Sequence, residues 1–342
     1  CRTLTKSFIH VMMINRQDLF YDKSVFHKKR FDLASPFCSR CGEQRREDGG
    51  IMAAYGLSCC STVDLSRQWA EERDVKLAYF HFFLGEKEYL DDFYESIRPE
   101  ELYQRMLAGE MTRTSQVNVE EYKALFRSVL SKGRDLLHIT LSSGISGSIN
   151  SARIAAEEMR EEFPERKVYV LDSLNASSGY GLLVDRAADL RDAGMGIEEL
   201  YEELQRLVAR QQSWFFTSDL TFFIRGGRVS KAAGWIGSLL NICPLLRVAE
   251  DGSLKAVEKV RGKKRVMDRI LQKMEELCKD GRDYSDKCFI SHSDCREDAE
   301  LLRVELRKRF PKLKTAEIFP IGSTIGCHTG PGTVALFFFG RE

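Results

Sequence analysis

The chain has 342 residues, with 52 basic and 51 acidic side chains and a formal net charge of +1. This balance gives no electrostatic case for binding nucleic acid or an anionic membrane surface. The length suits two domains rather than one core, and no apolar run approaches the roughly 18 residues of a membrane span. Arg2, Lys6, His10 and Arg16 interrupt any signal-peptide core. We therefore expect a cytoplasmic protein with no integral membrane segment and no nucleic-acid partner.

Residues 1–51 differ in composition from the rest of the chain. They carry the charge-dense stretch Arg40 to Asp48 and show no sustained helical or strand period. We expect a disordered or spurious N-terminal extension, with Met52 as a candidate start. The motif Cys38-x-x-Cys41 lacks the further ligands that a tetrahedral zinc site needs. We therefore expect no metal and no cofactor, and we interpret Cys59-Cys60 as small buried strand residues.

Strands and helices then alternate, which predicts an α/β domain over residues 52–171. This β-α repetition is typical of a parallel sheet with helices on both faces, a three-layer domain. Asp64 or Thr62 can cap the first helix, Pro99 opens the second, and Asn118 or its neighbour caps the third. We expect strands over 52–57, 75–84, 136–141 and 167–171, and helices over 65–73, from 98, 119–132 and 150–163.

The pattern changes after Asp172, and residues 172–342 form the predicted C-terminal domain. Two strands flank Asp251-Gly252, a strong hairpin signal. Other strands and helices follow without strict alternation, so we expect a mixed-sheet α/β domain. The helices are expected over 176–193, 197–212, 232–240, 264–279 and 296–310, and the strands over 214–217, 245–249, 253–260, 287–292, 315–319 and 332–339.

One serine-rich loop is the best candidate for a binding site. Ser142 to Ser148 contains four serines and two glycines where a predicted parallel strand ends and a helix begins. Open α/β sheets bind ligands at this position, and the free amides of a helix N-terminus favour an anion. A carboxylate and a phosphate would both suit it, and a serine-rich turn without a ligand is the structural alternative.

Two further polar stretches are candidates for a site. Thr112 to Gln116 is expected in a loop before a helix and, taken alone, is an ordinary capping turn. Ser323 to Thr333 is glycine-rich, which implies close backbone approach or positive φ, and it contains His328. No G-x-S-x-G elbow and no G-x-x-x-x-G-K-[ST] loop occurs, and His138 lies mid-strand with no evident catalytic role. We therefore expect anion binding and no catalytic residues.

Six motifs in register resemble the DegV family, from about residue 52 to the C-terminus. The motifs are Thr114-Ser115-Gln116; Ile145 to Ser148 with Asn150-Ser151-Ala152; Val170 to Ser173; Arg225-Gly226-Gly227-Arg228-Val229-Ser230; Gly237 to Ile242 with Pro244; and His328 to Gly332. The resemblance implies two α/β domains that hold a long-chain fatty acid between them. It also implies a lipid-binding protein, not itself an enzyme, that serves as the substrate-presenting subunit of a fatty-acid kinase in phospholipid metabolism.

The resemblance also implies roles for individual residues. Thr114 and Ser146 would hold the carboxylate, with Ser115 and Ser143 beside them, and His328 and Thr329 would form the far wall of the head-group pocket. Arg225 and Arg228 would meet the kinase subunit. Candidates for the tail tunnel are small and apolar residues of 232–246, with Phe222, Phe223 and Phe337 to Phe339.

Two departures from the family pattern lie near this pocket. Val117 and Asn118 stand where the family has Pro and Ser, and Cys60 stands where it has Asp. The loss of proline loosens the local geometry but removes no hydroxyl from Thr114. The alternative function is an enzyme or kinase subunit that binds a phosphorylated small molecule at the serine-rich loop.

Overall fold

The computed structural model describes residues 55–230 and 241–341. The predicted N-terminal extension, the Cys38-x-x-Cys41 motif and the helix expected over 232–240 lie outside these residues. In the described part of the chain, no helix is both long enough and apolar enough to cross a membrane.

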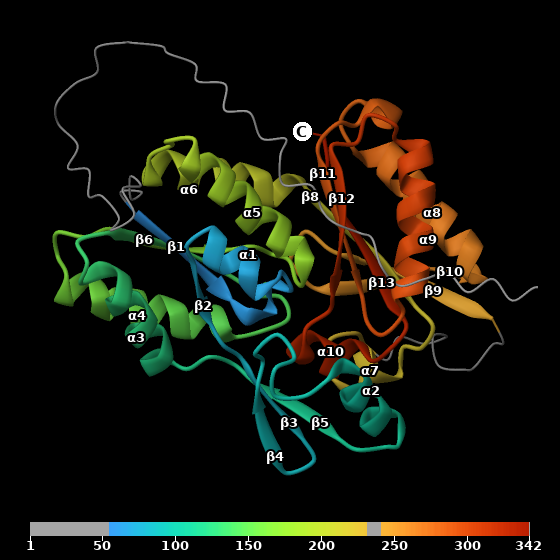
Figure 1. Cartoon of the computed structure of the whole chain (residues 1–342), viewed down its shortest axis with the longest axis horizontal. Coiled ribbons are helices and arrows are strands. Elements are labelled where there is room, and N and C mark those ends of the chain that lie inside the picture. Colours follow the sequence, from blue (N-terminus) through green and yellow to red (C-terminus); the bar gives the residue numbers. More distant parts are fainter. Residues whose placement is uncertain (1–54, 231–240, 342) are drawn as a thin grey trace, which may run out of the picture. The chain divides into compact units, whose positions relative to one another are not determined.

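The first sheet is parallel, as the sequence predicted. Its four strands lie in the order β2-β1-β6-β7, and every neighbouring pair is parallel. Helices α3 and α4 lie on one face and α5 and α6 on the other, which gives three layers (Figure 1). The bounds are β1 Tyr55–Cys60, β2 Val75–Ala78, β6 Asp135–Thr140, β7 Val168–Asp172, α3 Val119–Leu130, α4 Ser148–Glu162, α5 Ser178–Asp192 and α6 Ile197–Arg210.

The helix starts confirm two predicted caps and correct a third. Asn118 forms a capping box with Glu121 at the start of α3, and Pro99 begins α2 (Pro99–Leu107). Helix α1 (Arg67–Glu72) is capped by Ser66 and not by Asp64 or Thr62. An N-cap needs extended backbone, whereas Asp64 has a left-handed φ of 48° after the short helix η1 (Ser61–Val63).

The second sheet is mixed, also as predicted. Its six strands run in the order β10-β9-β8-β13-β11-β12, and only β11 and β12 are parallel. Helices α8 and α9 cover one face, where they bury an apolar cluster (Figure 1). The bounds are β8 Gln211–Thr217, β9 Ile242–Val248, β10 Leu254–Arg261, β11 Lys287–His292, β12 Thr315–Pro320, β13 Thr333–Phe339, α8 Lys263–Leu277, η2 Gly281–Asp283 and α9 Arg296–Arg309.

A third, antiparallel sheet was not predicted. The strand expected over 75–84 divides into β2 and β3 (His81–Leu84), and β3 pairs with β4 (Lys87–Leu90) and β5 (Thr112–Ser115). The expectation of a loop at Thr112 to Gln116 was therefore wrong. Strand β5 is a polar edge strand with one partner, so it lacks the apolar alternation that identifies a strand in sequence.

Two short helices lie beside this third sheet (Figure 1). Helix α7 (Thr221–Arg225) precedes the Gly-Gly turn, and α10 (Ser323–Thr329) occupies most of the glycine-rich stretch. The close approach and positive φ expected of its glycines are confirmed: Gly330 and Gly332 have φ of 63° and 86°, and a Cβ on Gly326 would lie 2.6 Å from the Tyr103 hydroxyl oxygen.

One continuous apolar core joins the two large sheets. It contains Leu57 and Ile139 of the parallel sheet, Leu183 of α5, and Phe289 and Phe337 of the mixed sheet. All described residues fall within one compact unit of the chain. The division at residues 171 and 172 stays a prediction.

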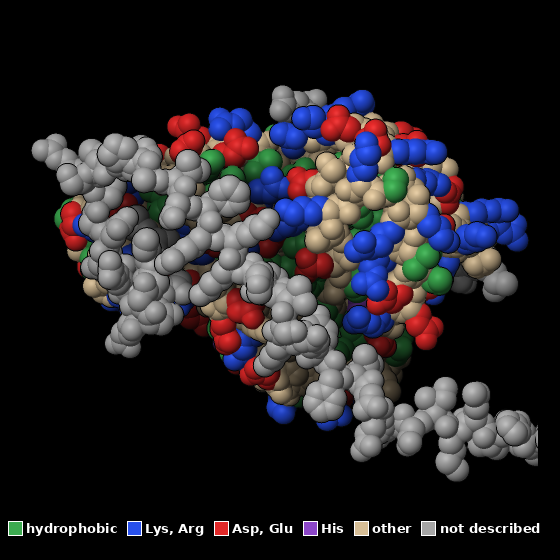
Figure 2. Space-filling view, turned by 45° about the horizontal axis from the view of Figure 1, so that its top comes forward, with side chains coloured by type: hydrophobic (Ala, Val, Ile, Leu, Met, Phe, Trp, Pro, Cys, Tyr) green, Lys and Arg blue, Asp and Glu red, His purple; other side chains and the backbone are tan. Residues whose placement is uncertain are grey.

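Basic side chains are prominent on part of the surface. On the face seen in Figure 2, Lys and Arg side chains gather on the side that contains α8 and α9, with acidic side chains among them.

Candidate functional site

The serine-rich loop follows the carboxyl end of β6 and leads into α4. The Ser146 amide donates to the Ser142 carbonyl at 3.1 Å, and the Ser148 amide donates to the Ser146 hydroxyl at 3.3 Å. The Ser142 hydroxyl donates to the Gly252 carbonyl at 2.9 Å, which ties the loop to the turn between β9 and β10. The loop is therefore held by both large sheets.

Thr114 approaches the same place from the third sheet. It lies on β5 opposite Phe82 of β3, and its hydroxyl is 2.9 Å from Nε2 of His328 on α10. The hydroxyl of Thr112, two residues earlier on the same face, donates to the Cys327 carbonyl at 3.1 Å. These two contacts fasten the edge strand to α10.

Thr114, Ser146 and Arg228 line two adjoining cavities. The outer one has a volume of about 460 Å³ and a polar wall that includes the exposed residues Gln116 and Ser143. The inner one has a volume of about 60 Å³ and also contacts His328 and Thr329, and its wall is largely apolar: Phe80, Leu141, Ile145, Ala176, Phe223, Leu254 and Ile325. The polar side chains of Thr114, Ser146 and Arg228 thus lie at the boundary between the polar outer cavity and the apolar inner cavity.

The inner cavity holds about two water molecules by volume, less than a long acyl chain needs. Of the predicted tail residues, Phe223 lines it, whereas Phe222 and Phe337 to Phe339 are packed in the cores and line neither cavity. Residues 232–240, predicted for the tail, lie outside the described part of the chain.

The charged groups of the site favour an anion. Arg228 is half-buried, and its guanidinium donates to the carbonyls of Ile145 at 3.2 Å and Gly226 at 2.7 Å. Burial lowers its pKa, and no described carboxylate lies within ion-pairing distance of it. Burial and then the charge of Arg228 lower the pKa of His328 to about 4, so the imidazole is neutral near pH 7. The site therefore combines neutral donors with one cation that lacks a counter-ion among the described residues.

Comparison with known proteins identifies the family. A sequence profile described as "Uncharacterised protein, DegV family" matches residues 60–341. This chain belongs to the DegV family.

Individual relatives cover nearly the same span. A DegV domain-containing protein of Clostridium perfringens is 34% identical over 84% of this chain and 98% of its own length. A Thermotoga maritima protein named fatty acid-binding protein is 32% identical over 81% of this chain and 94% of its own. The solved structure of a fatty-acid-binding DegV protein from Thermus thermophilus has a TM-score of 0.76 at 29% identity, and covers 84% of this chain and all of that one. The chain thus has the same α/β fold as these DegV proteins across the matched length.

The structure brings most of the predicted DegV site residues together and separates one. Ser115 and Ser143 line the outer cavity, and Thr329 lines the inner one, where its hydroxyl donates to the Gly330 carbonyl. Arg225 lines neither cavity: it is exposed, and its guanidinium lies 5.3 Å from the centre of the Phe222 ring.

Sequence reasoning missed the place of Arg228 in the pocket wall. The signal was the Gly-Gly pair between the two arginines, because Gly227 has a left-handed φ of 73° that reverses the chain. Residues on the two sides of such a turn face different ways. The sequence analysis had assigned both arginines to one surface that meets the kinase subunit.

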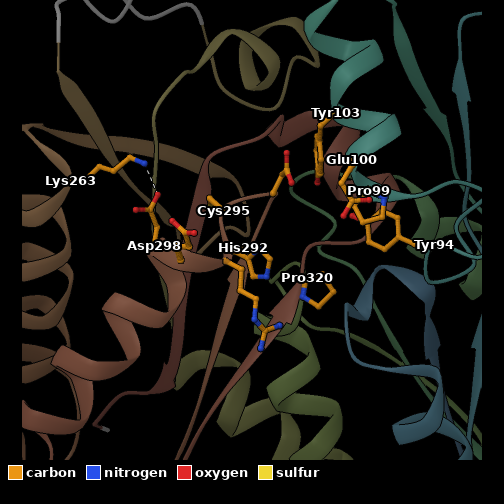
Figure 3. Close-up of a pocket in the computed structure, with 12 residues that line it drawn as sticks. Tyr94, Pro99, Glu100, Tyr103, Lys263, His292, Cys295, Asp298 and Pro320 are labelled. Carbon is orange, nitrogen blue, oxygen red and sulfur yellow. Dashed lines mark hydrogen bonds and ion pairs between the residues drawn. The ribbon is translucent and has the colours of Figure 1, made fainter. Parts of the chain in front are cut away.

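A larger cavity lies elsewhere and contains none of the predicted residues (Figure 3). It has a volume of about 560 Å³ and lies at the carboxyl ends of β11 and β12. The only ion pair drawn inside it joins Lys263 and Asp298 at 2.5 Å. Its other lining residues include Tyr94, Glu100, Tyr103, His292, Asp294, Cys295 and Arg296. In neither described range do three or more His, Cys, Asp or Glu side chains converge as a metal site would require.

Proposed function

We propose that this DegV protein binds a long-chain fatty acid, with the carboxylate at Thr114 and Ser146 and the acyl chain directed past Phe223. The observation that carries the proposal is that Thr114 on β5 and Ser146 in the loop after β6 line the same two cavities beside the cation Arg228. The Thermotoga maritima relative named for fatty-acid binding and the Thermus thermophilus structure support this ligand class.

The acyl chain supplies most of the binding energy in this proposal. About 15 methylenes at roughly 0.8 kcal/mol each give on the order of 12 kcal/mol of gross transfer energy. Association entropy opposes this by several kcal/mol. The hydroxyls and Arg228 therefore set the orientation of the ligand, and the inner cavity must widen to admit the chain.

The second part of the proposal is presentation of the bound acid to a fatty-acid kinase subunit in the cytoplasm, for acyl-phosphate formation. It rests on the family resemblance and on the exposure of Arg225 beside the pocket-lining Arg228. In this role the protein has no catalytic residue of its own and acts as a lipid carrier in phospholipid metabolism.

Native mass spectrometry tests the ligand. The purified protein should carry an added fatty-acid mass, which the double variant Thr114→Val/Ser146→Ala loses or strongly reduces. Ser128→Ala is the matched control, because it removes an exposed hydroxyl on α3 that donates only to the Leu125 carbonyl. A protein that is always empty and takes up no labelled fatty acid would contradict the proposal.

A phosphorylated small molecule is the second candidate ligand, favoured by the larger volume and polar wall of the outer cavity. Calorimetry distinguishes the two ligands. Saturable binding of a nucleotide or sugar phosphate that fatty acid does not displace would favour this second candidate.

A further inference from the structure

Two aspartates are buried together beneath the start of α10. Asp64 follows β1 and η1, Asp91 follows β4, and their exposed fractions are 3% and 2%. Within the described part of the chain, no Lys, Arg or His forms an ion pair with either of them. Arg67, a cation that lines the cavity beside them, pairs with Glu95 at 3.2 Å instead.

Both carboxylates converge on the residue that precedes α10. A side chain on Gly322 would begin 2.5 Å from Oδ1 of Asp64 and 3.4 Å from Oδ1 of Asp91. Glycine is therefore required here by the close approach of the two acids. Two ionised carboxylates so close together and so deeply buried would repel each other strongly.

The hydrogen-bond donors are shared unequally between the two acids. Asp91 accepts from the Ser323 amide at 3.1 Å through Oδ1 and from the Ser61 hydroxyl at 3.0 Å through Oδ2. Thr324 also directs its amide and hydroxyl at Asp91. Asp64 has fewer donors: the Ser177 hydroxyl donates to its Oδ2 at 2.5 Å, and the Gly322 amide is the other group directed at it. An ionised carboxylate needs donors at both oxygens, and a protonated one carries its own hydrogen. The arrangement suits an ionised Asp91 and a neutral Asp64.

We propose that Asp64 and Asp91 carry one proton between them in the folded protein, held on Asp64, and that this acid–carboxylate pair anchors the start of α10. The ionised Asp91 then receives the first amide of α10, from Ser323, without a second charge beside it. Because His328 and Thr329 lie on the same short helix, the pair also positions one wall of the carboxylate site; this last consequence rests on the proposed function.

The surroundings agree with a single negative charge. Burial and then the Asp91 charge raise the pKa of Asp64 well above its usual range, and burial raises the pKa of Asp91. The other titratable groups facing the pair from neighbouring elements are Tyr94, Tyr103, Tyr180, Cys60 and Cys327, with the Arg67–Glu95 ion pair at the edge of the cavity. Burial raises the pKa of each of these tyrosines and thiols, so none supplies a charge near pH 7.

The pH dependence of the unfolding free energy shows whether the folded protein binds this extra proton. An aspartate titrates near pH 3.9 in the unfolded chain. Since the pKa of Asp64 is raised in the folded state, folding binds an extra proton above about pH 4, and stability falls as pH rises towards the folded pKa. Across this window, the unfolding constant of the wild type should rise about tenfold per pH unit relative to that of Asp64→Asn. Urea unfolding from pH 4 to 9 provides the comparison.

Asp91→Asn is the matched control, because an amide nitrogen there would face one of the donors that Asp91 accepts from. We expect Asp64→Asn to be at least as stable as the wild type at pH 8 and to retain fatty-acid binding. Asp91→Asn should be less stable across the whole range. Equal pH slopes in wild type and Asp64→Asn, or the reverse order of the two variants, would overturn the proposal.

Two further measurements distinguish a failure of the shared-proton proposal from a failure of the proposed function. If Na⁺ or Ca²⁺ at constant ionic strength stabilised the wild type but not Asp64→Asn, the site would bind a cation, and the shared proton would be wrong. If neither wild type nor variant bound fatty acid while the predicted pH slopes appeared, the shared proton would stand and the proposed function would fail.

Discussion

Arg225 and Arg228 lie on either side of one turn, yet their side chains have different surroundings. Arg228 lines both cavities, whereas Arg225 is exposed beside Phe222. A charge-assisted hydrogen bond contributes about 1.5 to 3 kcal/mol. We therefore expect Arg228→Gln to weaken fatty-acid binding by roughly tenfold or more in a fluorescence displacement assay, because each 1.4 kcal/mol is a factor of ten.

Arg225→Gln is the internal control for that measurement, since it removes the same charge outside the pocket. It should leave the affinity for fatty acid unchanged. If Arg225 meets the kinase subunit, this variant should instead raise the concentration of loaded protein needed for half-maximal acyl-phosphate formation. Equal losses of fatty-acid affinity in the two variants would show that Arg228 acts only through overall charge.

Among the elements, the turn between β9 and β10 supports the serine-rich loop directly. A Cβ on Gly252 would lie 2.0 Å from the Ser142 hydroxyl oxygen, and Gly252 has a φ of 74°. Gly252→Ala should therefore displace Ser142, whose carbonyl accepts from the Ser146 amide, and weaken fatty-acid binding. Isothermal calorimetry on the folded variant measures this loss.

The variant Gly194→Ala distinguishes the effect of the Gly252–Ser142 contact from the effect of backbone strain. Gly194 also has a left-handed φ, of 93°, but nothing lies within 4 Å of its Cβ position. Each substitution forces alanine into a conformation that costs about 1 to 2 kcal/mol. Gly194→Ala should thus lose stability in urea while its affinity for fatty acid stays at the wild-type value. A similar loss of affinity in both variants would contradict a role for the turn.

The elements that sequence patterns predicted and those they missed differ in a physical way. Strands β6 and β13 are almost entirely buried, and apolar side chains predominate in both, so the run of side chains identifies them. Strand β5 is polar because it forms a sheet edge, and α10 is short and rich in residues typical of loops. The contact between Thr114 and His328 joins residues 214 positions apart. No local pattern contains that pairing, and only the family resemblance suggested it.

At the scale of the whole molecule, the proposed ligand contacts segments that belong to three different sheets or their connections. Strand β5, the loop after β6 and α10 each contribute to the walls of the inner cavity. A ligand that contacts all three segments holds them together. When its free concentration is 100 times its Kd, it stabilises the folded protein by about 2.7 kcal/mol.

Hydrogen exchange measured with and without fatty acid tests this. Addition of fatty acid should slow the exchange in all three segments, in peptides covering 112–116, 142–148 and 323–329. The same experiment on Thr114→Val/Ser146→Ala should show little added protection, and a fatty alcohol of equal length should protect less, because it leaves Arg228 without an anion. Protection confined to one of the three segments would mean that the ligand lies outside the junction, and the carboxylate would then need another partner than Thr114 and Ser146.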